Sequence, residues 1–224
     1  MEMKKMSNIE FPFVETRGKK RTKFSSPVKC QIRYLNEMKD VLYDKKWAKN
    51  APNFGLYYMY RGIKPPHLLI GDGGKEKNDI RYDITVIPPR MLGKEFVKTK
   101  GHEHIGNYGE LYKVLAGEGI FLIQDKKVKN IYFIRAKKGE FVKIPSNFDH
   151  TTINPSPKTL KVANWVSKEC KSDYKSIEKK KGFCYYYTIR GWLKNKNYKK
   201  IFKLKEKKPL KFFPKNLNFL YGKN

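Results

Sequence analysis

Short strand-like segments, separated by turn residues, run through most of this 224-residue chain. The segments are rich in β-branched and aromatic residues, and they cover residues 57–61, 82–87, 94–98, 110–115, 119–124, 130–135, 140–145, 160–166 and 183–189. Glycine-containing turns join several of them, for example GNYG at 106–109 and AGEG at 116–119. Many short strands at this spacing predict an all-β sandwich or barrel.

The strand-rich region has a different flank on each side. Residues 1–30 are polar, basic and weakly patterned, so we expect an N-terminal arm, followed by a barrel domain over residues 31–190. Within that domain, apolar residues recur at helical spacing over 37–50, which predicts one amphipathic helix that stops before Pro52. Residues 191–224 mix lysines with aromatic residues and form a basic C-terminal extension.

The chain is strongly basic, because 50 Lys and Arg residues stand against 21 Asp and Glu residues, for a net charge of +29. These basic residues are spread over the whole sequence, which favours a general lysine-rich composition over a dedicated nucleic-acid-binding protein. The basic and aromatic C-terminal extension leaves binding to single-stranded nucleic acid as an alternative. A positive field would also attract a phosphorylated small molecule.

Cysteine use and hydropathy indicate the compartment. Cys30, Cys170 and Cys184 form no Cys-x-x-Cys pair, and a sparse odd set is typical of a reducing cytosol rather than of a disulfide scaffold. The N-terminus lacks the apolar core of a secretory signal, and no stretch approaches 18 apolar residues. We therefore expect a cytoplasmic protein with no membrane span.

Three of the four histidines fall into one pattern with a glutamate. His102 and His104 are two residues apart, so on a strand both rings would point to the same face. Glu110 follows after a short turn, and His150 stands on the return from the strand that ends at Pro145. Three imidazoles and one carboxylate suit a divalent transition metal, whereas a single buried histidine is more often structural.

The spacing of these residues resembles the two motifs of the cupin family. Gly117 follows Glu110 at the cupin distance, and Gly139, Pro145, His150 and Asn154 match the second motif. Asn147 stands where that motif usually has glycine, and asparagine also tolerates a left-handed turn. The resemblance implies a cupin barrel, also called a double-stranded β-helix or jelly roll, with His102, His104, Glu110 and His150 as ligands of one metal ion per chain.

The segment TVIPPRMLGKEFVKTKGHEH at 85–104 resembles the cupin-type, archaeal-type glucose-6-phosphate isomerases. The resemblance implies that Thr85, Thr99, Gly101 and Tyr174 hold the phosphate of a sugar-phosphate substrate. It further implies a homodimer and a divalent ion, with Fe²⁺ favoured and Zn²⁺, Mn²⁺ or Ni²⁺ possible choices. The chain departs from the family at Val166 and Ser172, where other members usually offer aromatic or polar groups.

The implied reaction is the aldose–ketose interconversion of glucose 6-phosphate and fructose 6-phosphate in glycolysis and gluconeogenesis. Glu110 could move the proton between C1 and C2 as a general base, although a hydride shift would use the same residues. Tyr108 and Tyr112, two residues on either side of Glu110, could bind substrate hydroxyls or simply fill the barrel. Lys98 and Lys100 would add positive charge. Another cupin metalloenzyme, such as a dioxygenase, and a non-catalytic sugar-phosphate-binding cupin are the alternatives.

Overall fold

The computed structural model describes residues 29–63 and 79–222, and the expected N-terminal arm lies almost wholly outside these residues. A six-stranded antiparallel sheet forms one wall of the molecule. Its strands, in spatial order, are β1 (Cys30–Tyr34), β2 (Gly55–Tyr60), β3 (Ile80–Ile87), β12 (Leu160–Ser167), β7 (Glu110–Ala116) and β10 (Phe141–Ile144). Neighbours such as β3 and β12 are far apart in sequence, so the sheet joins both ends of the domain.

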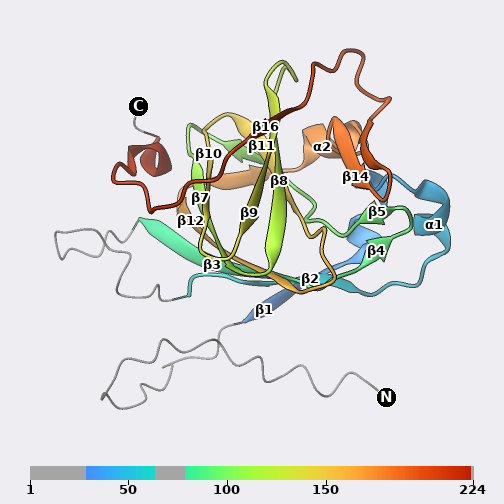
Figure 1. Cartoon of the computed structure of the whole chain (residues 1–224), viewed down its shortest axis with the longest axis horizontal. Coiled ribbons are helices and arrows are strands. Elements are labelled where there is room, and N and C mark those ends of the chain that lie inside the picture. Colours follow the sequence, from blue (N-terminus) through green and yellow to red (C-terminus); the bar gives the residue numbers. More distant parts are fainter. Residues whose placement is uncertain (1–28, 64–78, 223–224) are drawn as a thin grey trace.

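A second, four-stranded sheet stands against the first (Figure 1). It contains β11 (Phe148–Ile153), β8 (Glu118–Asp125), β9 (Ile131–Lys137) and β16 (Lys205–Lys207). β8 is buried along almost its whole length, and its Phe121 and Leu122 are fully buried in a continuous apolar core shared with the six-stranded sheet. Burial of this apolar surface is the main force that holds the two sheets together. The expected all-β cupin barrel is confirmed.

Two small sheets accompany the two large ones. One pairs β6 (Glu103–Ile105) with β13 (Lys171–Asp173), and the other contains β4 (Met91–Leu92), β5 (Glu95–Phe96), β14 (Tyr185–Thr188) and β15 (Gly191–Lys194). The short helix α2 (Lys175–Lys179) follows β13 directly. Among the described residues, no helix is long and apolar enough to cross a membrane.

The single helix expected over 37–50 was wrong. The segment forms two 3-10 turns, η1 (Leu35–Glu37) and η2 (Lys39–Val41), before the short helix α1 (Lys45–Asn50) begins. Leu42 interrupts the helix because its backbone is extended (φ −90°, ψ 152°) and its side chain is fully buried. Asp44 then starts α1 as its N-cap, accepting a hydrogen bond from the Trp47 amide over 3.0 Å. Core packing of the apolar residues has overridden the helical pattern.

The C-terminal segment, residues 191–222, packs along the barrel rather than standing apart from it (Figure 1). β16 pairs in parallel with β9, and Leu210 forms a backbone bridge with Phe141. The segment ends in a 3-10 turn, η4 (Asn218–Tyr221), which contacts β7 and β12 and buries Leu220. Some aromatic residues of the basic extension therefore serve as packing groups, as Phe213 does against Trp165, whereas Phe212 is 84% exposed.

Candidate metal centre and substrate pocket

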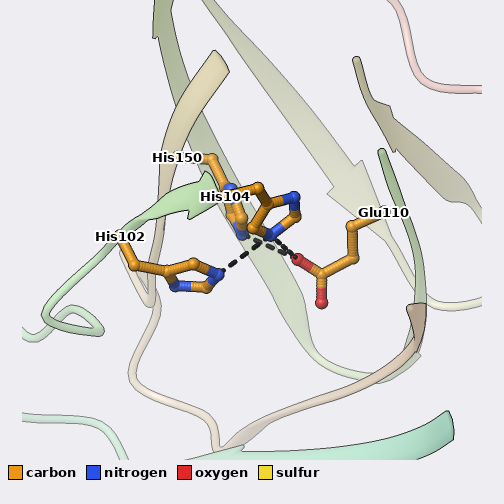
Figure 2. A group of neighbouring side chains, drawn as sticks. All are labelled: His102, His104, Glu110 and His150. Atoms are coloured by element: carbon orange, nitrogen blue, oxygen red, sulfur yellow. Dashed lines mark hydrogen bonds and ion pairs between the residues drawn. The ribbon is translucent and has the colours of Figure 1, made fainter. Parts of the chain in front are cut away.

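His102, His104, Glu110 and His150 converge inside the barrel (Figure 2). His104 lies on β6, Glu110 is the first residue of β7, and His150 lies in the middle of β11. His102 precedes β6 and forms a backbone bridge with His150, in which each amide donates to the other carbonyl over 3.2 Å. The potential ligand atoms of all four side chains lie within 4.8 Å of one another. The sequence pattern therefore corresponds to one cluster in space.

The spacing of the ligand atoms fits a divalent transition metal. His104 Nε2 lies 3.0 Å from His102 Nε2 and 3.2 Å from Glu110 Oε2, and His150 Nε2 lies 3.0 Å from the same oxygen. Ligands about 2.1 Å from one ion are separated by roughly 3.0–3.4 Å when they occupy adjacent positions. Among the described residues, the buried Glu110 Oε2 also has no aligned hydrogen-bond donor. An ion would satisfy that oxygen and the three nitrogens together.

Neighbouring groups hold two of the four side chains in orientations suitable for binding an ion. His104 Nδ1 lies 2.9 Å from the Tyr108 carbonyl oxygen, so it donates a proton there and directs Nε2 into the cluster. Asn164, on β12, donates from Nδ2 to Glu110 Oε1 over 2.6 Å and so leaves Oε2 facing the imidazoles. Tyr112 borders the cluster with its hydroxyl 3.0 Å from His150 Nε2.

Burial and mutual charge set the protonation of the cluster. Burial acts to raise the pKa of Glu110, but contacts with His104 and His150 outweigh it and hold that pKa well below its ordinary value. Burial lowers the pKa of His102 well below its ordinary value and also lowers that of His150. An ionised carboxylate and neutral imidazoles are the forms that bind a metal.

His104 differs from the other two histidines. Burial acts to lower its pKa, but contacts with Cys170 and Glu110 outweigh burial and raise the pKa to about 10. The negative charge of Glu110 thus retains a proton on His104 when nothing else balances it. A divalent cation bound beside Glu110 would balance the same charge and displace that proton.

The four residues expected to hold a phosphate all line the pocket that contains the cluster, namely Thr85, Thr99, Gly101 and Tyr174. The Thr99 hydroxyl accepts a hydrogen bond from the Thr152 amide over 3.0 Å, which fixes the side chain beside β11. Gly101 has a positive φ of 72°, and a Cβ at this position would overlap the Phe183 ring. Glycine is therefore required for the backbone to take this path into the pocket.

The pocket is also lined by three arginines that were not predicted from the sequence, namely Arg33, Arg61 and Arg81. Lys100 also lines the pocket, and its Nζ and the Arg33 guanidinium lie 5.3 Å and 5.8 Å from the centre of the Tyr174 ring. Strand alternation could have indicated Arg81, because it lies four residues before Thr85 on β3 and therefore shares its face. Arg33 and Arg61 carry no such local signal, because the pairing of β1, β2 and β3 brings them to the pocket.

Two expected contributors lie elsewhere. Tyr108 is not among the residues that line the pocket, and its backbone carbonyl, rather than its ring, supports His104. Tyr108 precedes β7, which begins only at Glu110, so strand alternation does not place its ring on the face of Glu110. Lys98 is buried outside the pocket, where its Nζ contacts Glu95 Oε1 at 2.5 Å and the Val41 carbonyl at 3.0 Å. Its charge is thus neutralised by Glu95 outside the pocket, whereas Lys100 lines the pocket and pairs there with Glu178.

An all-β cupin barrel with a His₃Glu cluster defines the general class of the protein. The family model described as "Glucose-6-phosphate isomerase (GPI)" matches residues 35–203, and the chain belongs to this family. The matched range includes the whole cluster and every residue named above as lining the pocket except Arg33.

Similar curated proteins include three glucose-6-phosphate isomerases of archaea. The chain is 28% identical to that of Thermococcus litoralis over 68% of its own length and 77% of the relative. It is 31% identical to that of Thermococcus onnurineus (49% of the chain, 57% of the relative) and 33% identical to that of Pyrococcus furiosus (36% and 42%). The chain thus spans just over half of the length of the Thermococcus onnurineus relative and less than half of that of the Pyrococcus furiosus relative.

Solved structures with a partial likeness include vicilin from Capsicum annuum, at 16% identity and a TM-score of 0.37 over 52% of this chain and 30% of that one. A variant of the oxalate decarboxylase of Bacillus subtilis matches at 14% identity and a TM-score of 0.36, over 49% and 25% of the two chains.

Proposed function

We propose that this protein is a metal-dependent aldose–ketose isomerase that interconverts glucose 6-phosphate and fructose 6-phosphate. The observation that carries the proposal is that one pocket contains both the His₃Glu cluster and the hydroxyl, glycine and basic groups suited to a phosphate. Membership of the glucose-6-phosphate isomerase family supports the same activity. An enzyme that acts on unphosphorylated compounds would have no use for the second set of groups.

The phosphate would bind at the wall formed by Thr85, Thr99 and Gly101. Short hydroxyls and a backbone amide can donate to phosphate oxygens, and a glycine allows close approach of the backbone. Lys100 adds a positive charge at this wall, although Glu178 contacts its Nζ at 2.6 Å. Tyr174 closes the site from the start of α2.

The sugar carbons would lie beside the cluster, where Glu110 and Tyr112 are the groups that can act on them. A divalent ion, when bound by the four ligands, would supply positive charge beside the C1 and C2 oxygens. Glu110 is ionised, and Asn164 holds only its Oε1, so Oε2 could accept a proton from carbon when it leaves the metal or shares it. Burial and the neighbouring Glu110 charge hold the pKa of Tyr112 well above its ordinary value, so Tyr112 remains a hydrogen-bond donor.

Metal identity and assembly belong to the proposal as well. We propose one divalent ion per chain, with Fe²⁺ as the first candidate and Zn²⁺, Mn²⁺ or Ni²⁺ next, because His₃Glu sites accept each of these ions. We also propose a homodimer, by resemblance to the family, which a measurement of molecular mass in solution would test.

The decisive experiment is an isomerase assay of the full chain, loaded in turn with each of the four metals. Glucose 6-phosphate, mannose 6-phosphate, fructose 6-phosphate and free glucose are the substrates. We expect turnover of the first and third and none of free glucose. Absence of turnover with every metal, while sugar phosphate still binds, would replace the enzyme by a sugar-phosphate-binding cupin.

Replacement of Thr85 tests the phosphate wall within the same assay. Thr85→Val removes the hydroxyl with little change in shape and should raise KM for glucose 6-phosphate about tenfold, with unchanged metal content. Thr159→Val, at an exposed threonine outside the pocket, is the matched control and should leave KM unaltered. An unchanged KM in Thr85→Val would remove this residue from the phosphate site.

A further inference from the structure

Two arginines of the pocket, Arg61 and Arg81, form ion pairs with the buried carboxylate of Asp83. Arg81 Nε lies 3.0 Å and 2.9 Å from the two oxygens of Asp83, and Arg61 Nη1 lies 3.2 Å from Asp83 Oδ2. The Gly62 amide donates to the same carboxylate over 2.9 Å, and Gln31 Oε1 accepts from Arg61 Nε over 3.1 Å. The two guanidinium groups are thus held side by side, with two positive charges against one negative charge.

Much of the donor capacity of this pair remains available. Only Nε of Arg81 is hydrogen-bonded to Asp83, and within the described part of the chain neither of its terminal nitrogens has a hydrogen-bond partner. The Arg81 and Arg61 side chains are 29% and 40% exposed, whereas that of Asp83 is 3% exposed. An arginine fixed through Nε presents its two terminal nitrogens as a planar fork, which matches two oxygens of a phosphate or carboxylate.

Arg81 lies level with the metal cluster and four residues from Thr85 of the proposed phosphate wall, and Asp83 links Arg61 to it. Across the sheet, Arg81 pairs with Val166 on β12, and Val166 pairs with Glu110 on β7, so Arg81 and Glu110 stand at the same level. Thr85 lies four residues further along β3, about 13 Å away at the usual rise per residue. Val166, with its small side chain, lies on the strand between Arg81 and Glu110.

We propose that Arg61 and Arg81 form a second anion subsite, which binds an anionic group at the C1 end of an open-chain hexose derivative. The proposal rests on the proposed function, since it assumes that the 6-phosphate occupies the wall of Thr85, Thr99 and Gly101. The ligand class is an acyclic sugar phosphorylated at both ends, which would span both anion subsites and exclude substrate from the pocket. Asp83 is the positioning residue of the subsite.

Binding of two matched ligands to the full, Zn²⁺-loaded chain tests the subsite without relying on turnover. Glucitol 6-phosphate and glucitol 1,6-bisphosphate differ only in the second phosphate, and calorimetry gives the Kd of each at about 0.15 M salt, where long-range charge effects are screened. We expect the bisphosphate to bind at least about tenfold more tightly, as one charge-assisted contact predicts. Arg81→Met and Arg61→Met should each lose most of this preference while retaining zinc.

Two further variants separate the geometry of the subsite from general charge. Arg190→Met removes the same charge at an exposed arginine outside the pocket and should retain the full preference. Arg81→Lys retains the charge but not the fork, so it should restore only part of the preference. Should Arg81→Met fold poorly, the Arg81→Lys and Arg61→Met variants still decide the question.

The outcomes distinguish this subsite from the function on which it rests. Equal affinities of the two ligands for the wild-type protein would overturn the subsite while leaving the phosphate wall intact. A preference that survives in both arginine-to-methionine variants would assign the second phosphate to the metal or to the general basic field, and would also overturn it. If glucitol 6-phosphate did not bind at all, the proposed function and the subsite would both be rejected.

Discussion

Asn164 holds Glu110 from the neighbouring strand, donating from Nδ2 to Oε1 over 2.6 Å, with both side chains buried. Asn164 belongs to β12 and Glu110 is the first residue of β7, so the contact joins two adjacent strands of the large sheet. It fixes the carboxylate with one oxygen occupied and the other directed at the imidazoles. The orientation of Glu110 therefore depends on an amide that binds no metal itself.

Asn164→Leu should weaken metal binding or lower kcat by about 10–100-fold, which is the usual effect of removing a group that orients a metal ligand. The leucine has a similar volume but cannot donate, so it leaves Oε1 buried without a partner. Metal titration and steady-state kinetics measure the two effects. Asn50→Leu, on the exposed side of α1, is the control and should change neither. Unaltered affinity and kcat in Asn164→Leu would mean that the hydrogen bond is dispensable.

Removal of one imidazole should abolish tight metal binding. We expect His102→Ala and His150→Ala to bind far less than one divalent ion per chain after dialysis, whereas the wild-type protein retains one. Elemental analysis of the purified proteins gives the metal content directly. His67→Ala is the matched control, since His67 is the one histidine of the sequence that the ligand pattern leaves out. Full metal content in His102→Ala would place the ion elsewhere.

The sequence predicted the ligand cluster better than the rest of the pocket, for a physical reason. The spacing of His102 and His104 refers to a single strand, where alternation fixes which residues share a face. The meeting of Arg61, Arg81 and Asp83 depends instead on the pairing of β2 with β3, which no local pattern in one sequence reveals. Tyr108 was misplaced because the strand start, the least certain part of such a prediction, falls between it and Glu110.

The fold shows the same division between local and non-local information. Long alternating segments such as 110–115 and 160–166 correspond closely to β7 and β12. Of the segment predicted at 94–98, only Glu95–Phe96 forms a strand, β5. The two-residue strand β4 and the parallel strand β16 are too short to carry a pattern of their own, and their pairing with β5 and β9 defines them. The helical spacing at 37–50 failed because burial of Leu42 in the core outweighed local propensity.

Gly101 should be the most sensitive glycine of the pocket. Gly101→Ala combines a positive φ of 72° with a Cβ that overlaps Phe183 and lies 2.8 Å from the His150 carbonyl, so we expect a loss of about 2–4 kcal/mol in the free energy of unfolding. Gly139→Ala is the matched control, because its φ of 92° is also positive but its Cβ would meet nothing within 4 Å. The control should lose only about 1 kcal/mol. Urea denaturation of both variants measures the difference, and equal losses would attribute the effect to backbone strain alone.

Asp149 should make stability depend on pH. Burial raises its pKa to about 6, while Gln124 donates to one oxygen over 3.2 Å, and the other oxygen has no partner in the described residues. Because the folded pKa exceeds that of the unfolded chain, the ionised carboxylate destabilises the fold above about pH 6. This destabilisation disappears as the pH falls from about 6 toward 4, where the folded state takes up the proton.

Asp149→Asn should therefore raise the free energy of unfolding by roughly 2 kcal/mol at pH 7.5, with a much smaller gain at pH 4.5. Urea denaturation of both proteins at the two pH values gives the difference, in which the other titrating groups cancel. Asp40→Asn, at a side chain that is 82% exposed, is the control and should show almost no change at either pH. A gain that is the same at both pH values would assign the effect to packing rather than to charge.

Glu110→Gln tests whether the carboxylate moves a proton as well as binding the metal. The amide preserves the shape of the side chain and can still accept from Asn164, but it has no basicity. We therefore expect kcat to fall by about 10²–10⁴-fold, the usual contribution of a general base, with a smaller loss of metal affinity. Kinetics at saturating metal, together with the metal content of the variant, separate the two effects. His104→Gln, which removes a ligand without removing a base, should lose metal in step with activity.

Isotope exchange then identifies the route between C1 and C2. If Glu110 takes the proton from C2 and exchanges it with water, glucose 6-phosphate recovered from ²H₂O should carry deuterium at C2. Complete retention of the original hydrogen would indicate direct transfer between the two carbons and would leave Glu110 as a ligand only. In that case Glu110→Gln should lose activity only in proportion to its loss of metal. The combination of solvent exchange in the wild-type protein and a large loss of kcat in the metal-loaded variant is what general-base catalysis by Glu110 requires.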